Sequence, residues 1–323
     1  MEIKAKDRMD KMQRREFLGL GGKAAAGIAA GALLPLSGVA ASAAAAPKKD
    51  YYAFSRVFQF LDWDHAAELL AKAGYTGVEW TVRAKGHVEP ARAREDLPKA
   101  VRAAEKQGLK ADMIVVDFLT PDTPADVEVV KAAADCGVKA FRPAYFKYDT
   151  SLSVQDNLSQ IRAGFVKLAR LAEETGVKFH YQNHSTYNPK IMLFGSLVWD
   201  LWEVIRDFDP RFVGVQYDPM HAMAESGPSW LRSIEIVAPW ISTVCLKDFW
   251  FEPNPKNPKM WRRHLCPAGE GIVPWADVRT LCARYHVTAP YSVHYDYSFP
   301  TDAAGAAACA AKDVAFFKSV LGS

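Results

Sequence analysis

The sequence lacks the cysteine spacing that a thiolate metal site needs. Its cysteines are scattered and none stands in a CxxC pair, which argues against a zinc site built from cysteine. Their odd number leaves at least one thiol free even in an oxidising compartment. We expect most of them to be small buried residues; they are Cys136, Cys245, Cys266, Cys282 and Cys309.

The sequence also lacks the glycine patterns of nucleotide-binding loops and an unbroken membrane span. No GxGxxG or Walker pattern follows the first strand-like segment, Tyr51–Phe60, so nucleotide binding has no support. The apolar stretch near the N-terminus is rich in alanine and is broken by glycine and by Pro35. This composition argues against a transmembrane anchor.

The same N-terminal stretch has the outline of a twin-arginine export signal. Arg14 and Arg15 precede Phe17 and open a run of small and apolar residues that ends near Ala46. We therefore predict a signal over residues 1–46, the export machinery of that pathway as a partner, and a periplasmic mature chain. Cleavage is expected after the small residues at 41–43 or close to Ala46.

Outside the predicted signal, the chain carries no excess of either charge. Residues 1–46 hold seven of the 40 basic and four of the 37 acidic residues, which leaves 33 of each sign in residues 47–323. Such a chain lacks the electrostatic signature of nucleic-acid or anionic-membrane binding. We therefore expect no nucleic-acid partner, and one large domain over residues 47–323.

Strand-length apolar runs alternate with amphipathic segments about eight times along residues 47–323. This alternation is typical of successive βα units, and eight units without a linker predict an α/β fold, the (β/α)8 TIM barrel. The predicted strands are Tyr51–Phe60, Gly77–Val82, Ala111–Phe118, Ala140–Tyr148, Lys178–Ser185, Phe212–Asp218, Ile241–Phe249 and Tyr291–Tyr297. The predicted helices include Asp64–Ala73, Asp96–Gln107, Val154–Thr175, Ser196–Phe208, Trp230–Val237, Trp275–Arg284 and Ala303–Leu321.

Polar side chains gather where four successive predicted strands end, which is where a barrel of this kind carries its site. Side chains two residues apart on a strand share a face, so one member of each pair can point into the barrel mouth. The pairs are Gln182 with His184, Cys245 with Lys247, and His294 with Asp296, and strand 2 adds Glu79 with Arg83.

Four segments resemble the sugar phosphate isomerase/epimerase superfamily, the xylose-isomerase-like TIM barrels. They are Tyr217-Asp218-Pro219-x-His221, Cys245-Leu246-Lys247-Asp248, Gly269-Glu270-Gly271-x-x-Pro274-Trp275 and Gly77-Val78-Glu79. The resemblance implies a divalent metal, often manganese, held by Glu, Asp, His and Glu on strands 5 to 8. It also implies a base that moves a proton while the metal holds the oxygens of a keto sugar.

Carried over by position, the resemblance implies a metal set of Gln182, Asp218 and His294, for Mn²⁺, Zn²⁺ or Mg²⁺. Cys245 stands at the position of the strand-7 His and is left out of the set as barrel interior. Asp296 could replace or supplement His294. A set with one carboxylate, an amide and an imidazole can still take a first-row metal, but it is expected to bind the metal more weakly.

The two glutamates that serve as acid and base in the superfamily are missing, and an amide cannot accept a proton at neutral pH. His184 and His294 can titrate near neutrality, and burial or a nearby metal could lower the pKa of Lys247. An apolar lining could raise the pKa of Glu79. We hypothesise that His184 or Lys247 handles the proton, with Glu79 as a further catalytic candidate.

Other polar and aromatic residues near the predicted strand ends are candidates for substrate contacts. Aromatic rings stack on the C–H faces of sugars, so Trp250 and Trp261 could line a carbohydrate-binding cleft. The basic stretch Lys256–Arg263 is predicted to be a solvated loop. Two structural alternatives stay open. Lys247-Asp248 could be a buried ion pair between neighbouring strands, and Gln182 and His184 could simply bond one another and the loop backbone. The predicted substrate-binding residues are Arg83, His87, Arg142, Tyr145, His221, Asp248 and Trp250.

The sequence thus predicts an exported, metal-assisted enzyme of the isomerase/epimerase type. Its small-molecule substrate would be a non-phosphorylated sugar or keto-sugar, because phosphorylated sugars are scarce outside the cytoplasm. Two alternatives remain open: a lyase that cleaves 3-keto-glycosides, and a carbohydrate-binding barrel that has lost catalysis. Barrels of this resemblance often pair, so a homo-oligomer is possible.

Overall fold

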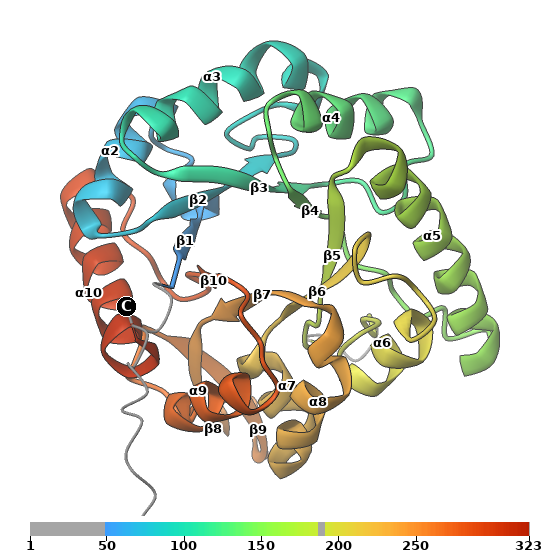
Figure 1. The fold of residues 1–323 in the computed structure, drawn as a ribbon. Helices are drawn as coiled ribbons and strands as arrows, with labels where there is room; N and C mark the ends of the chain where they lie inside the picture. Colours follow the sequence, from blue (N-terminus) through green and yellow to red (C-terminus); the bar gives the residue numbers. More distant parts are fainter. Residues whose placement is uncertain (1–48, 187–190, 323) are drawn as a thin grey trace, which may run out of the picture. The chain divides into compact units, whose positions relative to one another are not determined.

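Eight parallel strands close into a barrel in the computed structural model, which describes residues 49–186 and 191–322 (Figure 1). The strands follow one another in the order β1-β10-β7-β6-β5-β4-β3-β2 around the ring, so the predicted TIM barrel is confirmed. The predicted signal over residues 1–46 lies outside the described residues. The barrel strands are β1 Tyr51–Phe54, β2 Gly77–Val82, β3 Lys110–Val116, β4 Ala140–Arg142, β5 Lys178–Gln182, β6 Val213–Tyr217, β7 Ile241–Leu246 and β10 Tyr291–Val293.

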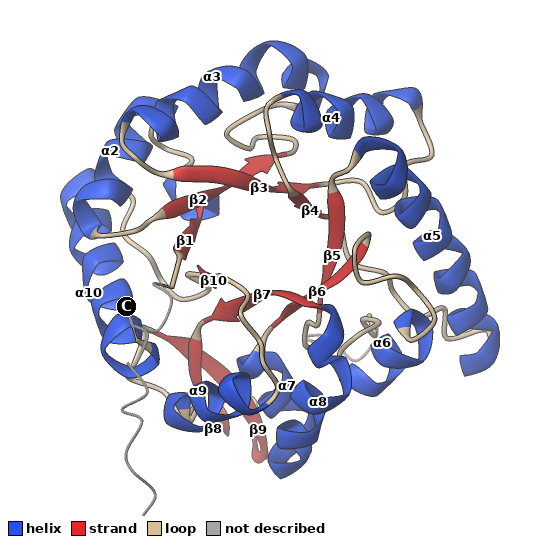
Figure 2. Ribbon diagram, viewed as in Figure 1, coloured by secondary structure: helices blue, strands red, loops and turns tan. Residues whose placement is uncertain are grey.

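Helices surround the strands and cover the outside of the barrel (Figure 2). Four of them, α5, α8, α9 and α10, have the bounds that the sequence predicts. None of the described helices is long and apolar enough to cross a membrane. The helices are α2 Trp63–Ala73, α3 Ala93–Lys106, α4 Pro124–Asp135, α5 Val154–Thr175, α6 Val198–Ile205, α7 Pro219–Ser226, α8 Trp230–Val237, α9 Trp275–Arg284 and α10 Ala303–Leu321.

Local sequence signals explain where these helices begin and end. Ser153 caps α5 by accepting a hydrogen bond from the backbone of Asp156, and the chain leaves the helix at Gly176 in the left-handed conformation. Thr123 and Asp126 form a reciprocal capping box at the start of α4. Such caps satisfy the free backbone groups at the ends of a helix and so fix the adjoining loops.

Several barrel strands are shorter than predicted, because the chain leaves the sheet before the polar residues begin. The predicted strand Tyr51–Phe60 ends at Phe54, and residues Ser55–Phe58 form a 3-10 turn instead. Strands β4 and β10 end at Arg142 and Val293 rather than near residues 148 and 297. The residues that follow belong to the loops at the carboxyl ends of the strands, which carry the site.

The segment after β7 is a β-hairpin, not the solvated loop that the sequence suggests. β8 (Asp248–Asn254) and β9 (Asn257–Cys266) pair in antiparallel fashion outside the barrel. Within the hairpin, Trp250 stacks on His264 with ring centroids 4.3 Å apart. Most residues of β9 are exposed, and the strand therefore lacks the apolar run by which buried strands are recognised.

Asp248 fixes the loop that follows this hairpin. Its carboxylate is buried and accepts hydrogen bonds from the backbone of Phe249 (3.0 Å), Gly269 (3.1 Å) and Val273 (3.2 Å). It also accepts a bond from the indole nitrogen of Trp275 (3.2 Å). The structure therefore gives Asp248 a loop-holding role, away from the substrate contact that the sequence suggested.

Replacing Asp248 by alanine should destabilise the barrel, because the buried donors of this loop would lose their acceptor. We expect the free energy of unfolding to fall by about 2–4 kcal/mol. Urea unfolding followed by circular dichroism measures the change. Asp277→Ala, which removes an exposed carboxylate from the neighbouring α9, should cost about 1 kcal/mol or less. Equal losses in the two variants would contradict the role of Asp248.

Candidate active site

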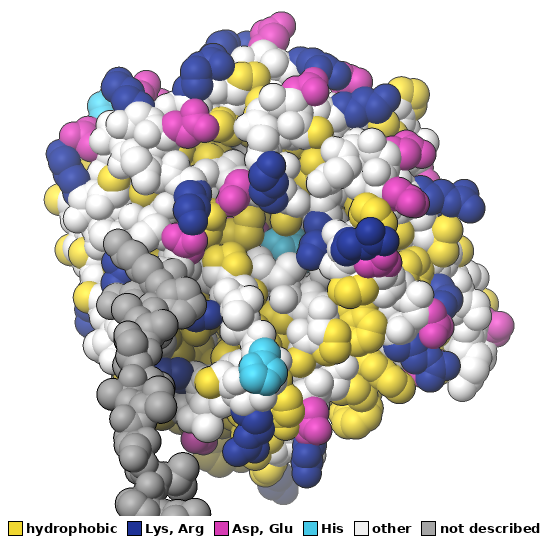
Figure 3. All heavy atoms as spheres, viewed as in Figure 1, with side chains coloured by type: hydrophobic (Ala, Val, Ile, Leu, Met, Phe, Trp, Pro, Cys, Tyr) yellow, Lys and Arg dark blue, Asp and Glu magenta, His cyan; other side chains and the backbone are white. Residues whose placement is uncertain are grey.

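Polar side chains from seven of the eight strand ends meet around a cavity of about 240 Å³. Phe54 and the apolar residues Val115, Val116 and Ala144 complete its lining. Figure 3 views the barrel from the opposite end, where the strands begin, and shows basic and acidic side chains interspersed on that face. The polar residues that line the cavity are Arg56, Arg83, Asp117, Arg142, Tyr145, Gln182, His184, Lys247, His294 and Asp296.

The ammonium group of Lys247 lies between two carboxylates. Its Nζ is 2.7 Å from Oδ2 of Asp296 and 3.1 Å from Oδ2 of Asp218, and the lysine is only 4% exposed. Burial acts against ionisation of Asp296, but the Lys247 ammonium outweighs it and holds the pKa of that carboxyl below its usual range. Lys247 therefore forms an ion pair between strands, as one alternative anticipated, but its partners are Asp218 and Asp296 instead of Asp248, and it also faces the cavity.

Asp218 is fixed from several directions at the end of β6. Its Oδ1 accepts a hydrogen bond from the backbone of His221 and so caps α7, while the Asn183 side chain bonds both the backbone N–H and the carbonyl of Asp218. The amide nitrogen of Gln182 donates to Asp218 Oδ2 at 2.9 Å. These contacts leave Oδ2 facing Lys247.

Gln182, Cys245 and His294 form a layer of side chains one pleat deeper than Lys247. The Gln182 amide nitrogen is 3.3 Å from Cys245 Sγ, which is 3.5 Å from His294 Nε2. Tyr145 donates to the Gln182 amide oxygen. Gln182 and His184 therefore do not satisfy one another; each has other partners. Burial raises the pKa of the Cys245 thiol well above its ordinary value, so this thiol is not a thiolate ligand.

Glu79 lies inside the barrel beneath His294. It accepts hydrogen bonds from Gln216 (2.9 Å) and Ser292 (2.7 Å), and His294 Nε2 is 3.5 Å from its Oε2. Burial alone would raise the pKa of Glu79, but the hydrogen bond and charge of His294 outweigh it and lower the pKa to about 2. The expectation of a raised pKa is therefore wrong, because polar partners surround this carboxylate where the sequence suggested an apolar lining.

His184, His221 and Asp296 form a group whose ligand atoms all lie within 4.8 Å of one another. Ser185 orients both imidazoles: its carbonyl oxygen is 3.0 Å from His184 Nδ1, and its hydroxyl is 2.8 Å from His221 Nδ1. Because a carbonyl only accepts, Nδ1 of His184 donates and the lone pair of its neutral ring is on Nε2. Burial lowers the pKa of both rings.

Two sets of side chains can therefore be compared as metal ligands. In the set that the resemblance implies, Gln182 directs its amide nitrogen at Asp218, and a nitrogen that donates a hydrogen bond cannot also bind a metal. His294 of the same set faces Glu79. The set His184, His221 and Asp296 offers two neutral imidazoles and a carboxylate, a donor combination that suits first-row divalent metals. The second set fits a metal better, although the sequence-based assignment of Gln182, Asp218 and His294 stays a prediction.

The remaining candidates divide by position. Arg83, Arg142 and Tyr145 line the cavity as their strand ends suggested. His221 stacks behind His184, with ring centroids 4.0 Å apart. His87 lies apart, against Ser55 and Trp80, and burial lowers its pKa to about 4. Trp250 is part of the hairpin.

Sequence reasoning missed three residues of the cavity, namely Phe54, Arg56 and Asp117. Phe54 and Arg56 fall within the predicted strand Tyr51–Phe60, and Asp117 is next to the end of the predicted strand Ala111–Phe118. The rule that strand ends carry the site would have found Phe54 and Arg56 if the first strand had been ended at Phe54, and Asp117 if the rule had been applied to the third strand.

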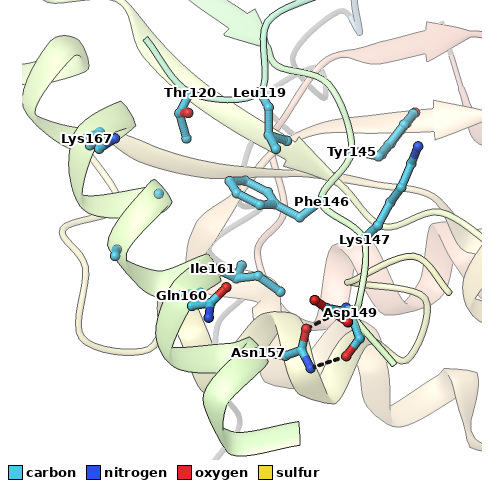
Figure 4. Close-up of a pocket in the computed structure, with 12 residues that line it drawn as sticks. Leu119, Thr120, Tyr145, Phe146, Lys147, Asp149, Asn157, Gln160, Ile161 and Lys167 are labelled. Carbon is cyan, nitrogen blue, oxygen red and sulfur yellow. Dashed lines mark hydrogen bonds between the residues drawn. The ribbon is translucent and has the colours of Figure 1, made fainter. Parts of the chain in front are cut away.

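A larger cavity of about 510 Å³ lies between α5 and the loops that follow β3 and β4 (Figure 4). Asn157 and Asp149 on its wall bond one another through side chain and backbone. Lys167 pairs with Asp122 outside it. This cavity gathers no cluster of titratable groups, so the smaller cavity at the barrel mouth is the candidate active site.

The closed barrel places the chain in the class of (β/α)8 barrels, with ionisable groups gathered at its strand ends. Residues 67–318 match the family described as xylose isomerase-like TIM barrel, and the chain belongs to that family. No curated protein matches the chain in sequence.

Solved structures with the same fold include several sugar epimerases. D-psicose 3-epimerase from Clostridium cellulolyticum H10 is 12% identical, with a TM-score of 0.60 over 85% of this chain and 100% of that one. The 3-keto-D-glucoside 4-epimerase from E. coli is 13% identical, with a TM-score of 0.62 over 84% and 100%. D-allulose 3-epimerase from Methylomonas sp., solved with D-allulose, is 15% identical, with a TM-score of 0.59 over 85% and 98%.

Proposed function

We propose that the protein is a sugar isomerase/epimerase-like enzyme that moves a proton on the carbon next to a carbonyl group. The substrate is a non-phosphorylated sugar or keto-sugar. One observation carries the proposal: a buried ammonium group, Lys247, faces the cavity between two carboxylates and beside two imidazoles. The likeness to epimerases that act on keto sugars supports it.

Lys247 supplies the positive charge in this proposal. Removing a proton beside a carbonyl places negative charge on the carbonyl oxygen, and a fixed ammonium group stabilises that oxygen most strongly in a cavity without bulk water. The carboxylates of Asp218 and Asp296 hold the ammonium in place, so it need not reorganise during the reaction.

His294 accepts the proton, and Glu79 positions it. Burial lowers the pKa of His294, so its imidazole is neutral and can take up a proton. The carboxylate of Glu79 lies below the ring at 3.5 Å and stabilises the imidazolium that forms. Glu79 is therefore a positioning residue here rather than the acid or base that the sequence suggested.

A divalent metal is the second part of the proposal, held by His184, His221 and Asp296. A metal at these residues would supply a Lewis acid for the carbonyl oxygen of the substrate. Lys247 opposes the metal, because its ammonium already contacts Asp296 at 2.7 Å. The charge near Asp296 therefore sets how tightly the cation binds.

A lyase that cleaves 3-keto-glycosides is the second candidate. It begins with the same proton removal beside a ketone, and the likeness to a 3-keto-D-glucoside epimerase favours testing it. A carbohydrate-binding barrel without catalysis is the third candidate, and it differs from both by leaving the C–H bond intact.

Solvent exchange at the carbon beside the carbonyl tests the reaction. Free ketoses and 3-keto-glucosides are incubated with the protein in D2O, and NMR follows deuterium uptake and product formation. His294→Gln and Lys247→Met should each slow exchange by about 10²- to 10⁴-fold, because each removes a group that acts in the proton transfer.

His264→Gln is the matched control, since this ring is exposed on the hairpin and should leave exchange unchanged. Exchange that survives both site variants would contradict the assigned roles. Binding of a sugar without any exchange would favour the binding barrel, and release of the aglycone would favour the lyase.

Metal content separates the two ligand sets without reference to activity. After chelator dialysis, Mn²⁺ and Zn²⁺ binding is measured by calorimetry and the bound metal by mass spectrometry. His184→Gln and Asp296→Asn should weaken binding at least about tenfold. Lys247→Met should strengthen it, because the variant removes a neighbouring positive charge.

Gln182→Leu tests the other set and should leave metal binding within about threefold of the wild type. Loss of the metal in Gln182→Leu, with retention in His184→Gln, would return the metal to the set that the sequence predicted. Absence of binding in wild type and Lys247→Met would show that Lys247 alone supplies the positive charge.

We further propose that residues 1–46 direct the folded protein to the periplasm. The pairing of two barrels stays a prediction. Replacing Arg14 and Arg15 together by lysine should abolish export in a bacterial host with an active twin-arginine pathway. Cell fractionation and N-terminal sequencing measure the result. Lys11→Gln is the control, and export of the double variant would contradict the assignment.

A further inference from the structure

Three arginines from neighbouring strand ends face the candidate active site from one side. Arg56 follows β1, Arg83 follows β2 and Arg142 ends β4. Arg142 is only 4% exposed. With Lys247, four cationic side chains line a cavity whose own acidic lining consists of Asp117 and Asp296.

The two carboxylates do not pair with Arg83 or Arg142. Asp296 pairs with Lys247 and lies 3.6 Å from Arg56. Asp117 is exposed and accepts a hydrogen bond from the backbone of Ala84. Neither Arg83 nor Arg142 forms an ion pair with a carboxylate within residues 49–186 and 191–322. The cavity therefore keeps positive charge on its β2–β4 side.

The guanidinium of Arg142 has bonding capacity left over. One of its terminal nitrogens donates to the hydroxyl of Tyr145 at 2.9 Å, but its buried Nε has no hydrogen-bond partner among the described residues. A buried guanidinium with an unmet donor is costly unless an acceptor binds.

Arg83 and Arg142 both lie against the ring of Phe54, and their charges repel one another. Their guanidinium carbons lie 5.7 Å and 5.4 Å from its centroid. Burial lowers the pKa of Arg83, and the charges of Arg142 and Arg56 lower it further. An anion between the two groups would relieve this repulsion.

The backbone holds both arginines in place. The N–H of Arg83 donates to Val88 and its carbonyl accepts from Gly86, so a tight turn fixes its position. Arg142 stands in β4, paired with Val115 of β3. The backbone positions of both arginines are therefore fixed before any ligand arrives, and the bond to Tyr145 also holds the guanidinium of Arg142, which reduces the entropy lost on binding.

We propose that the substrate is an acidic sugar whose carboxylate binds between Arg83 and Arg142. The proposal rests on the proposed function, because it uses the same cavity. Guanidinium groups match planar carboxylates in a two-pronged geometry, and the volume of about 240 Å³ suits a single sugar unit. The carboxylate would lie opposite Lys247, where the carbonyl reacts.

Calorimetry with matched pairs of sugars tests the proposal. D-glucuronate and D-galacturonate are compared with D-glucose and D-galactose, and D-glucose 6-phosphate is the third arm. We expect the uronates to bind about tenfold or more tightly than their neutral partners. Arg83→Met should remove this preference, because it should weaken the binding of the uronates much more than the binding of the neutral sugars.

Arg94→Met is the matched control, since Arg94 is exposed on α3 and pairs with Glu128 and Asp135. It should retain the preference for uronates. Arg142→Lys keeps the positive charge but loses the two-pronged geometry of the guanidinium, so it should weaken uronate binding. Circular dichroism reports whether this variant folds. If it does not fold, Arg83→Met decides alone.

Uronates that bind no better than neutral sugars, or not at all, would overturn the proposal. So would a preference for glucose 6-phosphate without one for the uronates, or a uronate preference that survives in Arg83→Met. Exchange in D2O separates this result from the proposed function. Tight binding of uronates without deuterium exchange would support the carboxylate site and contradict the proposed reaction. Exchange with neutral sugars alone would support the proposed reaction and contradict the carboxylate site.

Discussion

The ion pairs of Lys247 set the arrangement of the whole site. Transferring one ammonium and two carboxylates out of water is costly, and their attraction compensates only when all three are held at short distance. β7, β6 and the segment after β10 supply one group each, so closure of the barrel is what brings them together. The cap that Asp218 forms on α7 and its bonds with Asn183 then keep Oδ2 directed at the ammonium.

Charge is distributed unevenly across the cavity, and this follows from which strands carry which residues. Three arginines come from β1, β2 and β4, with only the exposed Asp117 of β3 among them in strand order, whereas the carboxylates of Asp218 and Asp296 follow β6 and β10 and pair with Lys247. Glu79 lies deeper, and bonds from Gln216 and Ser292 hold it within the barrel. A substrate with a carboxylate at one end and a carbonyl at the other would be aligned by this field before any proton moves.

The periodicity of the sequence was sufficient to predict the barrel, because each βα unit buries one apolar face at regular intervals. It also predicted that the site lies at the strand ends. It could not predict the pKa of Glu79, since His294, whose hydrogen bond and charge lower this pKa, is more than 200 residues away along the chain. The hairpin of β8 and β9 was missed because exposed strands give little apolar signal. Neither failure affected the barrel, whose strands are buried.

The hardest feature to predict was how deep in the barrel each side chain of a strand lies. This depth explains why the contacts of the site differ from those that the family resemblance implies. Gln182, Cys245 and His294 stand where the family resemblance places ligands, yet they bond one another as an inner layer. Two residues further along the same segments, about 6.6 Å by strand geometry, stand His184, Lys247 and Asp296, which carry the ionisable groups of the cavity. Side chains alternate between the two faces of a strand, so both members of each pair point to the same face. The sequence therefore cannot show which member lies at the depth of the site. The contacts of Lys247 with Asp296 and of Gln182 with Cys245 separate the two layers, and they put the ion pairs one pleat outward from His294, the proton acceptor that we propose.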